Sequence, residues 1–144
     1  MIRDVRAETA QGRADRLTLR VYYEDTDFSG RVYHASYLRF MERGRTEWLR
    51  ARGFAQHEMA RAGAVVFVVR RLTIDFVKSA LMDDLLTIET RLVRLGAASF
   101  DFSQAILRDD TMLAQANVGV VALKSDRPAR LPQDLRTRLT DGAD

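Results

Sequence analysis

The chain has 144 residues, of which 47% are hydrophobic and 30% charged, and its 23 lysines and arginines exceed its 20 acidic residues to give a net charge of +3. This size and balance are typical of one globular domain with a sizeable core. Because there is no cysteine, disulfides, thiolate nucleophiles and cysteine metal sites are excluded. The two histidines, His34 and His57, are too few for a typical zinc site, so we expect no metal.

No apolar run in the sequence approaches the roughly 20 residues that a membrane-spanning helix needs. Residues 1–6 also lack the apolar core of a signal peptide. We therefore expect a cytoplasmic protein without an integral membrane segment.

The positive charge is concentrated between Arg31 and Arg71, where nine arginines stand against three acidic residues. Such a stretch can meet the phosphates of a nucleic acid, a membrane surface or a phosphorylated cofactor. The commoner role of a charged stretch is to solvate the outer face of a helix.

The first predicted elements are a strand and a long helix. After a polar N-terminal tail, expected to be loosely held to about residue 15, a half-buried strand runs over about 17–23. A helical stripe then extends from about Ser36, as N-cap, to residue 52, and Gly53 is suited to the C-cap. Gly44 inside this helix costs about 1 kcal/mol relative to alanine, so we expect it to allow close packing onto a sheet.

The rest of the chain is predicted to be mainly strands. A short helix is expected near 55–62, and the apolar run 64–69 continues to Phe76 as a long strand, buried on both faces at first. Further strands are expected near 86–92, 100–106 and 112–122, with a terminal helical turn at 132–139 and a flexible tail from 140. Turns are expected at the Asp83-Asp84 pair, at Gly96 and at the Asp109-Asp110 pair.

This order of elements predicts an α+β fold in a single domain spanning residues 1–144. Hairpin-sized turns between the later strands exclude a doubly wound parallel sheet, whose strands need long crossovers. A curved antiparallel sheet wrapped around one long helix satisfies the pattern. Because one helix cannot cover the whole sheet, we expect part of it to meet another subunit.

Candidate chemistry is concentrated where the first strand passes through an acidic turn into the long helix. The chain lacks a nucleophile elbow, a Walker loop and a dinucleotide-binding glycine motif. Asp27 can supply a base or nucleophile, and the amides of a helix that starts near His34 can form an oxyanion site. Gly30 permits the tight turn and leaves room for a substrate.

Structural roles for the same residues stay open at this point. An aspartate in an acidic turn is commonly a cap or a turn former. His34 can equally be a structural histidine, because a helix N-terminus disfavours its protonated form.

An ordered motif nevertheless links this region to a known family. Its residues are Tyr22-Tyr23-Glu24-Asp25-Thr26-Asp27, Gly30, Val32-Tyr33-His34-Ala35-Ser36-Tyr37-Leu38, Phe40, Glu42-Arg43 and Arg45-Thr46-Glu47-Trp48-Leu49-Arg50, with weaker echoes at 83–90 and 127–132. This motif resembles the hot-dog-fold acyl-CoA thioesterases of the 4-hydroxybenzoyl-CoA thioesterase superfamily, in particular the Tol-Pal-associated bacterial branch.

The resemblance implies a five-stranded antiparallel sheet around a helix, assembly into homodimers or homotetramers, and an acyl-CoA site at the subunit interface. It places the catalytic carboxylate on Asp27, as nucleophile or general base, and the oxyanion amide on His34. Coenzyme A then belongs to the substrate, an acyl carrier protein is an alternative carrier, and no separate cofactor, metal or nucleic acid is implied. Because relatives often carry small residues or Pro-Ala after the catalytic aspartate, Phe28 is a departure that affects the acyl pocket.

Further site residues follow with less support from the motif. Gly30 and Tyr33 are assigned to substrate binding by their place in it, and Arg127 and Arg130 by their basic, proline-bounded loop. Other hot-dog thioesterases use a helical glutamate, so the alternatives to Asp27 are Glu42 and Glu47.

The expected function is hydrolysis of a short-chain or aromatic acyl-CoA to free acid and CoA. A hot-dog hydratase or dehydratase is a second enzymatic reading. A binding or assembly protein that uses its basic face is a third.

Overall fold

The structure, a computed structural model, describes residues 14–55, 57 and 65–142. In chain order its elements are β1 (Asp15–Arg20), the 3-10 turn η1 (Tyr23–Asp25), α2 (His34–Ala51), β2 (Val66–Phe76), β3 (Leu85–Leu95), β4 (Ser99–Arg108), β5 (Thr111–Lys124), β6 (Arg127–Pro128) and α4 (Gln133–Gly142). The predicted α+β class is confirmed. The short helix expected near 55–62 and most of the expected tails lie outside the described residues.

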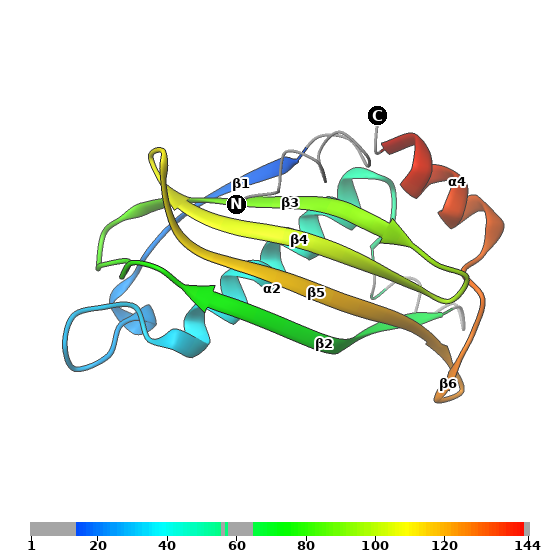
Figure 1. The fold of residues 1–144 in the computed structure, drawn as a ribbon, viewed down its shortest axis with the longest axis horizontal. Helices are drawn as coiled ribbons and strands as arrows, with labels where there is room; N and C mark the ends of the chain where they lie inside the picture. The colour runs from blue at the N-terminus through cyan, green and yellow to red at the C-terminus, as the bar shows by residue number, and fades with distance from the viewer. Residues whose placement is uncertain (1–13, 56, 58–64, 143–144) are drawn as a thin grey trace.

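The described strands form one antiparallel sheet in the order β1-β3-β4-β5-β2, with the two-residue β6 paired to the far end of β5. Short turns join β3 to β4 and β4 to β5, as predicted, and Asp109 in the second turn has a φ of 55°. Figure 1 shows β3, β4, β5 and β2 side by side, with α2 running along one face of the sheet. The predicted hot-dog arrangement, a sheet wrapped around one long helix, is confirmed.

The core lies between α2 and the inward face of the sheet. Strand alternation turns every second residue of β4 inward, so that Phe100 and Phe102 are buried while Asp101 between them lies on the outer face. From the helix, Phe40 and Trp48 are buried in the same core, and the Trp48 and Phe102 rings meet edge to face at 5.1 Å. This apolar contact is what holds the helix to the sheet.

Gly44 allows the close approach that the sequence predicted. A Cβ at this position would lie 2.8 Å from Thr90 Oγ1, 2.9 Å from Ile88 Cγ2 and 3.0 Å from Gln104 Nε2. The Gln104 amide in turn donates to Thr90 Oγ1 (2.8 Å) and to the carbonyl of Met41 (2.9 Å). The helix backbone is thus hydrogen-bonded to the sheet at the point where no side chain separates them.

The helix begins at His34, as expected for the oxyanion site, and two residues before the Ser36 that the helical stripe indicated. Its N-cap is Tyr33, which makes no side-chain capping hydrogen bond, so the prediction of Ser36 as N-cap is wrong. The cause is tertiary, because the Tyr33 amide donates to the carbonyl of Asp25 (2.9 Å) and fixes where the chain turns into the helix. Ser36 lies in the first turn, where its amide donates to the Tyr33 carbonyl (2.8 Å).

The predicted end of α2 is close to the observed one. Gly53 follows the C-cap residue Arg52 with a φ of 92°, a conformation that favours glycine. The Gly53 amide donates to the carbonyl of Arg50 (2.9 Å) and the Phe54 amide to that of Leu49 (3.0 Å). These two bonds are the Schellman arrangement that satisfies the last carbonyls of a helix.

Two strand predictions need correction. β1 ends at Arg20, and Tyr23, predicted to be its last inward residue, instead starts η1 with 80% of its surface exposed. β2 is not buried on both faces at its start, since Val68 and Val69 are 39% and 47% exposed. The reason is position, because β2 pairs only with β5 among the described strands and is an edge of the sheet.

The C-terminal helix α4 extends the helical turn predicted at 132–139. Leu135 and Leu139, one turn apart, are fully buried and attach it to the core. Among the described residues, no helix is long and apolar enough to span a membrane.

Candidate active site

The segment between β1 and α2 folds back on itself and joins the strand to the helix. The Asp25 carboxylate accepts the Tyr22 amide (2.9 Å), and the Asp25 carbonyl accepts the Tyr33 amide (2.9 Å). Asp25 is 5% exposed, and Arg39 of the helix approaches its carboxylate at 3.8 Å. Asp25 is therefore a structural residue that sets the entry into α2.

Beyond Asp25 the chain makes a tight turn that carries Asp27. Thr26 pairs with Val32 in an antiparallel bridge, and the Asp27 amide donates to the carbonyl of Arg31 (2.8 Å). The Gly30 amide donates back to the carbonyl of Asp27 (3.1 Å), with Gly30 at a φ of 83°. The positive φ supports the prediction that glycine is needed for this turn.

The Asp27 side chain is exposed and is held by a residue of its own turn. Its Oδ1 accepts the Ser29 amide (2.8 Å) and the Ser29 hydroxyl (2.6 Å). These two bonds are the main reason that the pKa of Asp27 lies below its usual value of 3.8, and the charge of Arg31 lowers it further. Asp27 is therefore a carboxylate at neutral pH.

The N-terminus of α2 lies just beyond this turn. Among the described residues, the amides of His34 and Ala35 donate to no protein oxygen, as is usual for the first amides of a helix without a side-chain cap. They also carry the positive end of the helix dipole. A carbonyl or carboxylate oxygen can bind there.

The His34 ring lies in an aromatic cluster, and among the described residues it forms no hydrogen bond or ion pair with the Asp27 carboxylate. Its centroid is 4.4 Å from that of Tyr33 and 6.5 Å from that of Phe76, at the end of β2. Phe76 also meets Tyr37 edge to face at 5.2 Å. Phe76 and Tyr33 are 50% and 46% exposed, so this cluster forms an apolar surface beside the helix N-terminus.

The connection between β2 and β3, residues 77–84, pairs with the end of the Asp27 turn. The Val32 amide donates to the carbonyl of Ala80 (2.9 Å), and Arg31 pairs with Leu81 in a second antiparallel bridge. The segment that closes the Asp27 turn is thus paired with the β2–β3 connection in a strand-like manner.

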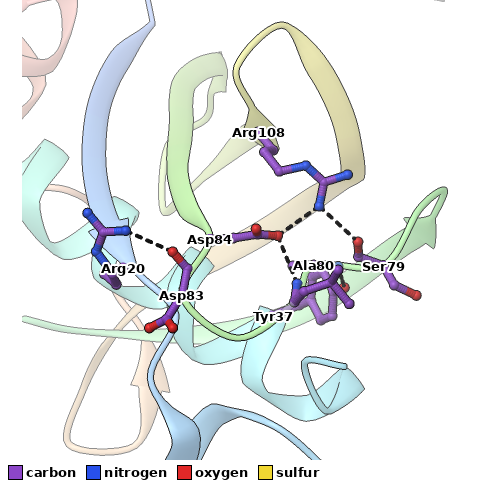
Figure 2. A network of polar contacts seen from close by, with 8 residues as sticks. Arg20, Tyr37, Ser79, Ala80, Asp83, Asp84 and Arg108 are labelled. Carbon is purple, nitrogen blue, oxygen red and sulfur yellow. Dashed lines mark hydrogen bonds and ion pairs between the residues drawn. The ribbon is translucent and has the colours of Figure 1, made fainter. Parts of the chain in front are cut away.

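That supporting loop is held by the polar network of Figure 2. The Ala80 amide donates to the Tyr37 hydroxyl of α2 (2.9 Å). The Asp84 carboxylate accepts the Leu81 amide (2.8 Å) and Nη1 of Arg108 at the end of β4 (2.7 Å). Helix, loop and sheet together keep the Asp27 turn in place relative to the helix N-terminus.

Not all the predicted site residues lie together. Asp27, Gly30, Tyr33 and His34 share the turn and the helix start. Arg127 and Arg130 belong to β6 and the segment after it, which Figure 1 shows at the opposite end of the long axis from the light blue turn before α2. Within one chain these two groups form separate regions.

The alternative carboxylates lie farther along α2. Glu42 and Glu47 are both exposed, and Glu47 approaches Arg50 of the same helix at 3.4 Å. Glu42 lines a hollow of about 140 Å³ between α2 and β2, with Arg45 and an apolar wall of Leu49, Phe67, Val69, Phe100 and Phe102. Neither glutamate shares the turn and helix start where Asp27 lies.

The sequence argument missed the role of Ser29. A serine two positions after an aspartate is a pattern that favours an Asx turn, in which the aspartate oxygen accepts a backbone amide two residues on. That signal was available in Asp27-Phe28-Ser29. The support from residues 77–84 had no such signal, because it depends on contacts between distant parts of the chain.

Comparison with known proteins places this geometry in a family. The family model described as the thioesterase-like superfamily matches residues 21–139. An acyl-CoA thioesterase YbgC of Haemophilus influenzae is 42% identical over 120 residues, covering 82% of this chain and 88% of its own length. An acyl-CoA thioester hydrolase YbgC of Escherichia coli O6:H1 is 42% identical over 123 residues, covering 83% of this chain and 91% of its own.

Solved structures agree. The crystal structure of a probable thioesterase from Bartonella henselae is 45% identical, with a TM-score of 0.79, and the match covers 83% of this chain and 99% of that one. The resemblance noted in the sequence is therefore confirmed, and the chain belongs to the thioesterase-like superfamily.

Proposed function

We propose that the protein is an acyl-CoA thioesterase that hydrolyses a short-chain or aromatic acyl-CoA to free acid and CoA, with Asp27 as the catalytic carboxylate. The observation that carries this proposal is an exposed, ionised Asp27 on a closed turn that directly precedes the uncapped N-terminus of α2. The names of the relatives, acyl-CoA thioesterase and acyl-CoA thioester hydrolase, support the reaction class.

In the proposed reaction the thioester carbonyl oxygen accepts hydrogen bonds from the free amides of His34 and Ala35. When the carbonyl carbon is attacked, this oxygen becomes an oxyanion, and the amides and the helix dipole stabilise it more than the starting carbonyl. The contribution of His34 is then its backbone N–H, while its ring belongs to the apolar cluster with Tyr33 and Phe76.

Asp27 can act by either of two routes. As a nucleophile, its carboxylate attacks the carbonyl carbon and CoA leaves as a thiolate that takes up a proton; water then hydrolyses the mixed anhydride. As a general base, it takes a proton from a water molecule whose oxygen attacks the carbonyl directly; the C–S bond then breaks, and the departing CoA thiolate takes up the proton. Both routes need an ionised carboxylate, which the Ser29 hydrogen bonds favour.

The remaining predicted residues fit this function if two subunits build the site. We propose that Arg127 and Arg130 contact the phosphates of CoA, as arginines commonly do. Their segment lies at the opposite end of the folded molecule from the Asp27 turn. In a homodimer or homotetramer they would therefore serve the Asp27 site of a partner subunit.

The test is a thiol-release screen over saturated short-chain and aromatic acyl-CoAs, since hydrolysis alone frees the thiol from a saturated substrate. We expect Asp27→Asn to lower kcat/KM by about 10²–10⁴-fold, the usual range for loss of such a group. Asp134→Asn, an exposed aspartate on α4, is the matched control and should retain full activity. A folded Asp27→Asn protein with near-normal turnover would remove Asp27 from the mechanism.

A further inference from the structure

A second hollow lies on the outer face of the sheet, away from α2. It measures about 160 Å³ and is lined by Arg70 and Arg71 of β2, Arg94 of β3, Ser99 and Asp101 of β4, and Gly119 and Val120 of β5. One bound water molecule needs only about 10–15 Å³ by the same measure, so the hollow has room for a group of several non-hydrogen atoms.

The hollow arises from the pairing register of four neighbouring strands. Arg94 pairs with Asp101, Asp101 with Gly119, and Gly119 with Arg71, which places the four residues in one row across the sheet. Gly119, in the middle of the row, has no side chain. A Cβ there would lie 3.4 Å from Asp101 Oδ1 and 3.7 Å from Arg71 Cβ, so the glycine is what leaves the hollow open.

A β-bulge brings two consecutive arginines to this hollow. The register of β2 against β5 shifts between Val69 and Arg71, so that Arg70 is the extra residue without a partner on β5. Successive residues of a regular strand point to opposite faces, yet Arg70 and Arg71 line the same hollow.

The charges in the hollow are unbalanced. Asp101 is matched by Arg94, which donates to it from Nε (2.6 Å) and Nη2 (3.2 Å) and also reaches Ser99 Oγ (2.8 Å). In the described part of the chain, no hydrogen bond or ion pair joins the guanidinium of Arg70 or Arg71 to an acceptor, and both residues are exposed. Two positive charges with free donors therefore face an open hollow.

We propose that Arg70 and Arg71 form a binding site for the phosphate group of a soluble phosphate ester. Guanidinium groups bind phosphate oxygens through paired, charge-assisted hydrogen bonds, and the hollow beside Gly119 has the size for one such group. The site lies on the sheet face opposite α2 and does not depend on the function proposed for Asp27.

Calorimetric titration with inorganic pyrophosphate tests the site directly. We expect the wild-type protein to bind pyrophosphate. The Arg70→Gln/Arg71→Gln double variant should have a dissociation constant at least about tenfold higher, as for the loss of a hydrogen bond to a charged group. Arg43→Gln, which removes one positive charge from an exposed position on α2, is the control and should bind like the wild type. Asp27→Asn should also bind normally, which separates this site from the catalytic proposal.

A second variant fills the hollow without changing its charge. Gly119→Val should weaken pyrophosphate binding by a similar factor, because its side chain occupies the space beside Arg71. Absence of binding to the wild type, unchanged binding to Gly119→Val, or an equal loss in Arg43→Gln would each overturn the proposal.

Competition identifies the source of the phosphate. Stronger displacement of pyrophosphate by CoA than by 3′-dephospho-CoA would support the site and assign it to the 3′-phosphate of CoA. Displacement by inorganic phosphate but by neither form of CoA would support the site and assign it to a different phosphate ester.

Discussion

At the scale of single residues, the contacts between Asp27 and Ser29 have two effects, one on the turn and one on the charge of the carboxyl group. The same two hydrogen bonds that close the turn also stabilise the charged form of the carboxyl group. Because the pKa is lower in the folded protein, the stability that these bonds add is present above the unfolded-state pKa and is lost as the pH falls through the folded-state value.

Ser29→Ala should therefore raise the pKa of Asp27 toward its ordinary value, since the serine hydroxyl is the largest cause of the shift. The measurement is an NMR titration of the Asp27 carboxyl carbon, with the acidic limb of kcat/KM expected to move to higher pH in parallel. Ser29→Thr keeps a hydroxyl and should restore the lower value. Equal titration midpoints in the wild type and Ser29→Ala would show that the hydroxyl does not stabilise the carboxylate.

A second residue-scale prediction concerns Tyr37 in the loop support. Its hydroxyl accepts the amide of fully buried Ala80, so Tyr37→Phe leaves that N–H without a partner. We expect the free energy of unfolding to fall by about 1–3 kcal/mol, measured by urea denaturation. Tyr23→Phe, at an exposed ring, is the control and should change stability little. An unchanged midpoint in Tyr37→Phe would mean that the loop repacks around another acceptor.

At the scale of elements, α2 is defined by how closely it approaches the sheet. Alanine normally favours a helix over glycine by about 1 kcal/mol. At position 44, however, its methyl group would meet Thr90 and Ile88 at under 3.0 Å, and both side chains lie in the packed interior.

We expect Gly44→Ala to lower the free energy of unfolding by about 1–3 kcal/mol, the usual cost of overpacking, which exceeds the gain in helix propensity. Arg43→Ala, next to it on the exposed face, is the control and should stay within about 0.5 kcal/mol of the wild type. Chemical denaturation measures both. A Gly44→Ala protein more stable than the wild type would show that the sheet yields to the added methyl group.

For strand β2, the sequence predicted the type of element correctly but its burial wrongly. Its apolar run predicted a strand, and a strand is present at Val66–Phe76. Its predicted burial was wrong, because hydrophobicity does not distinguish a strand covered within its own chain from one at an edge. Exposed apolar residues on an edge strand instead suggest contact with another chain.

At the scale of the whole molecule, that edge leads to a prediction about assembly. We expect the protein to sediment as a dimer or larger, and Val69→Asp, which places a charge on the exposed edge beside the hollow at Arg45, to shift it toward the monomer. Thr137→Asp, at an exposed position on α4, is the control and should not dissociate it. A monomeric wild type at micromolar concentration in analytical ultracentrifugation would contradict the proposed shared site.

Much of this protein was readable from its sequence. Alternation with a period of two predicted β3, β4 and β5, a helical period predicted α2, and acidic or glycine-containing turns separated them, because these signals depend only on neighbouring residues. The motif from Tyr22 to Arg50 placed the chain in its family, and it singled out Asp27 as the candidate that experiments now have to test.

Tertiary structure decided what depends on pairing between distant segments. The carbonyl of Asp25 accepts the Tyr33 amide and holds the entry into α2, and the sheet order leaves β2 at an edge. Strand register brings Arg71, Gly119 and Asp101 into one row. These pairings have no signature in any one segment, because the partners of an inter-strand hydrogen bond depend on the whole fold. A hydrophobic period, in contrast, depends only on residues within one segment.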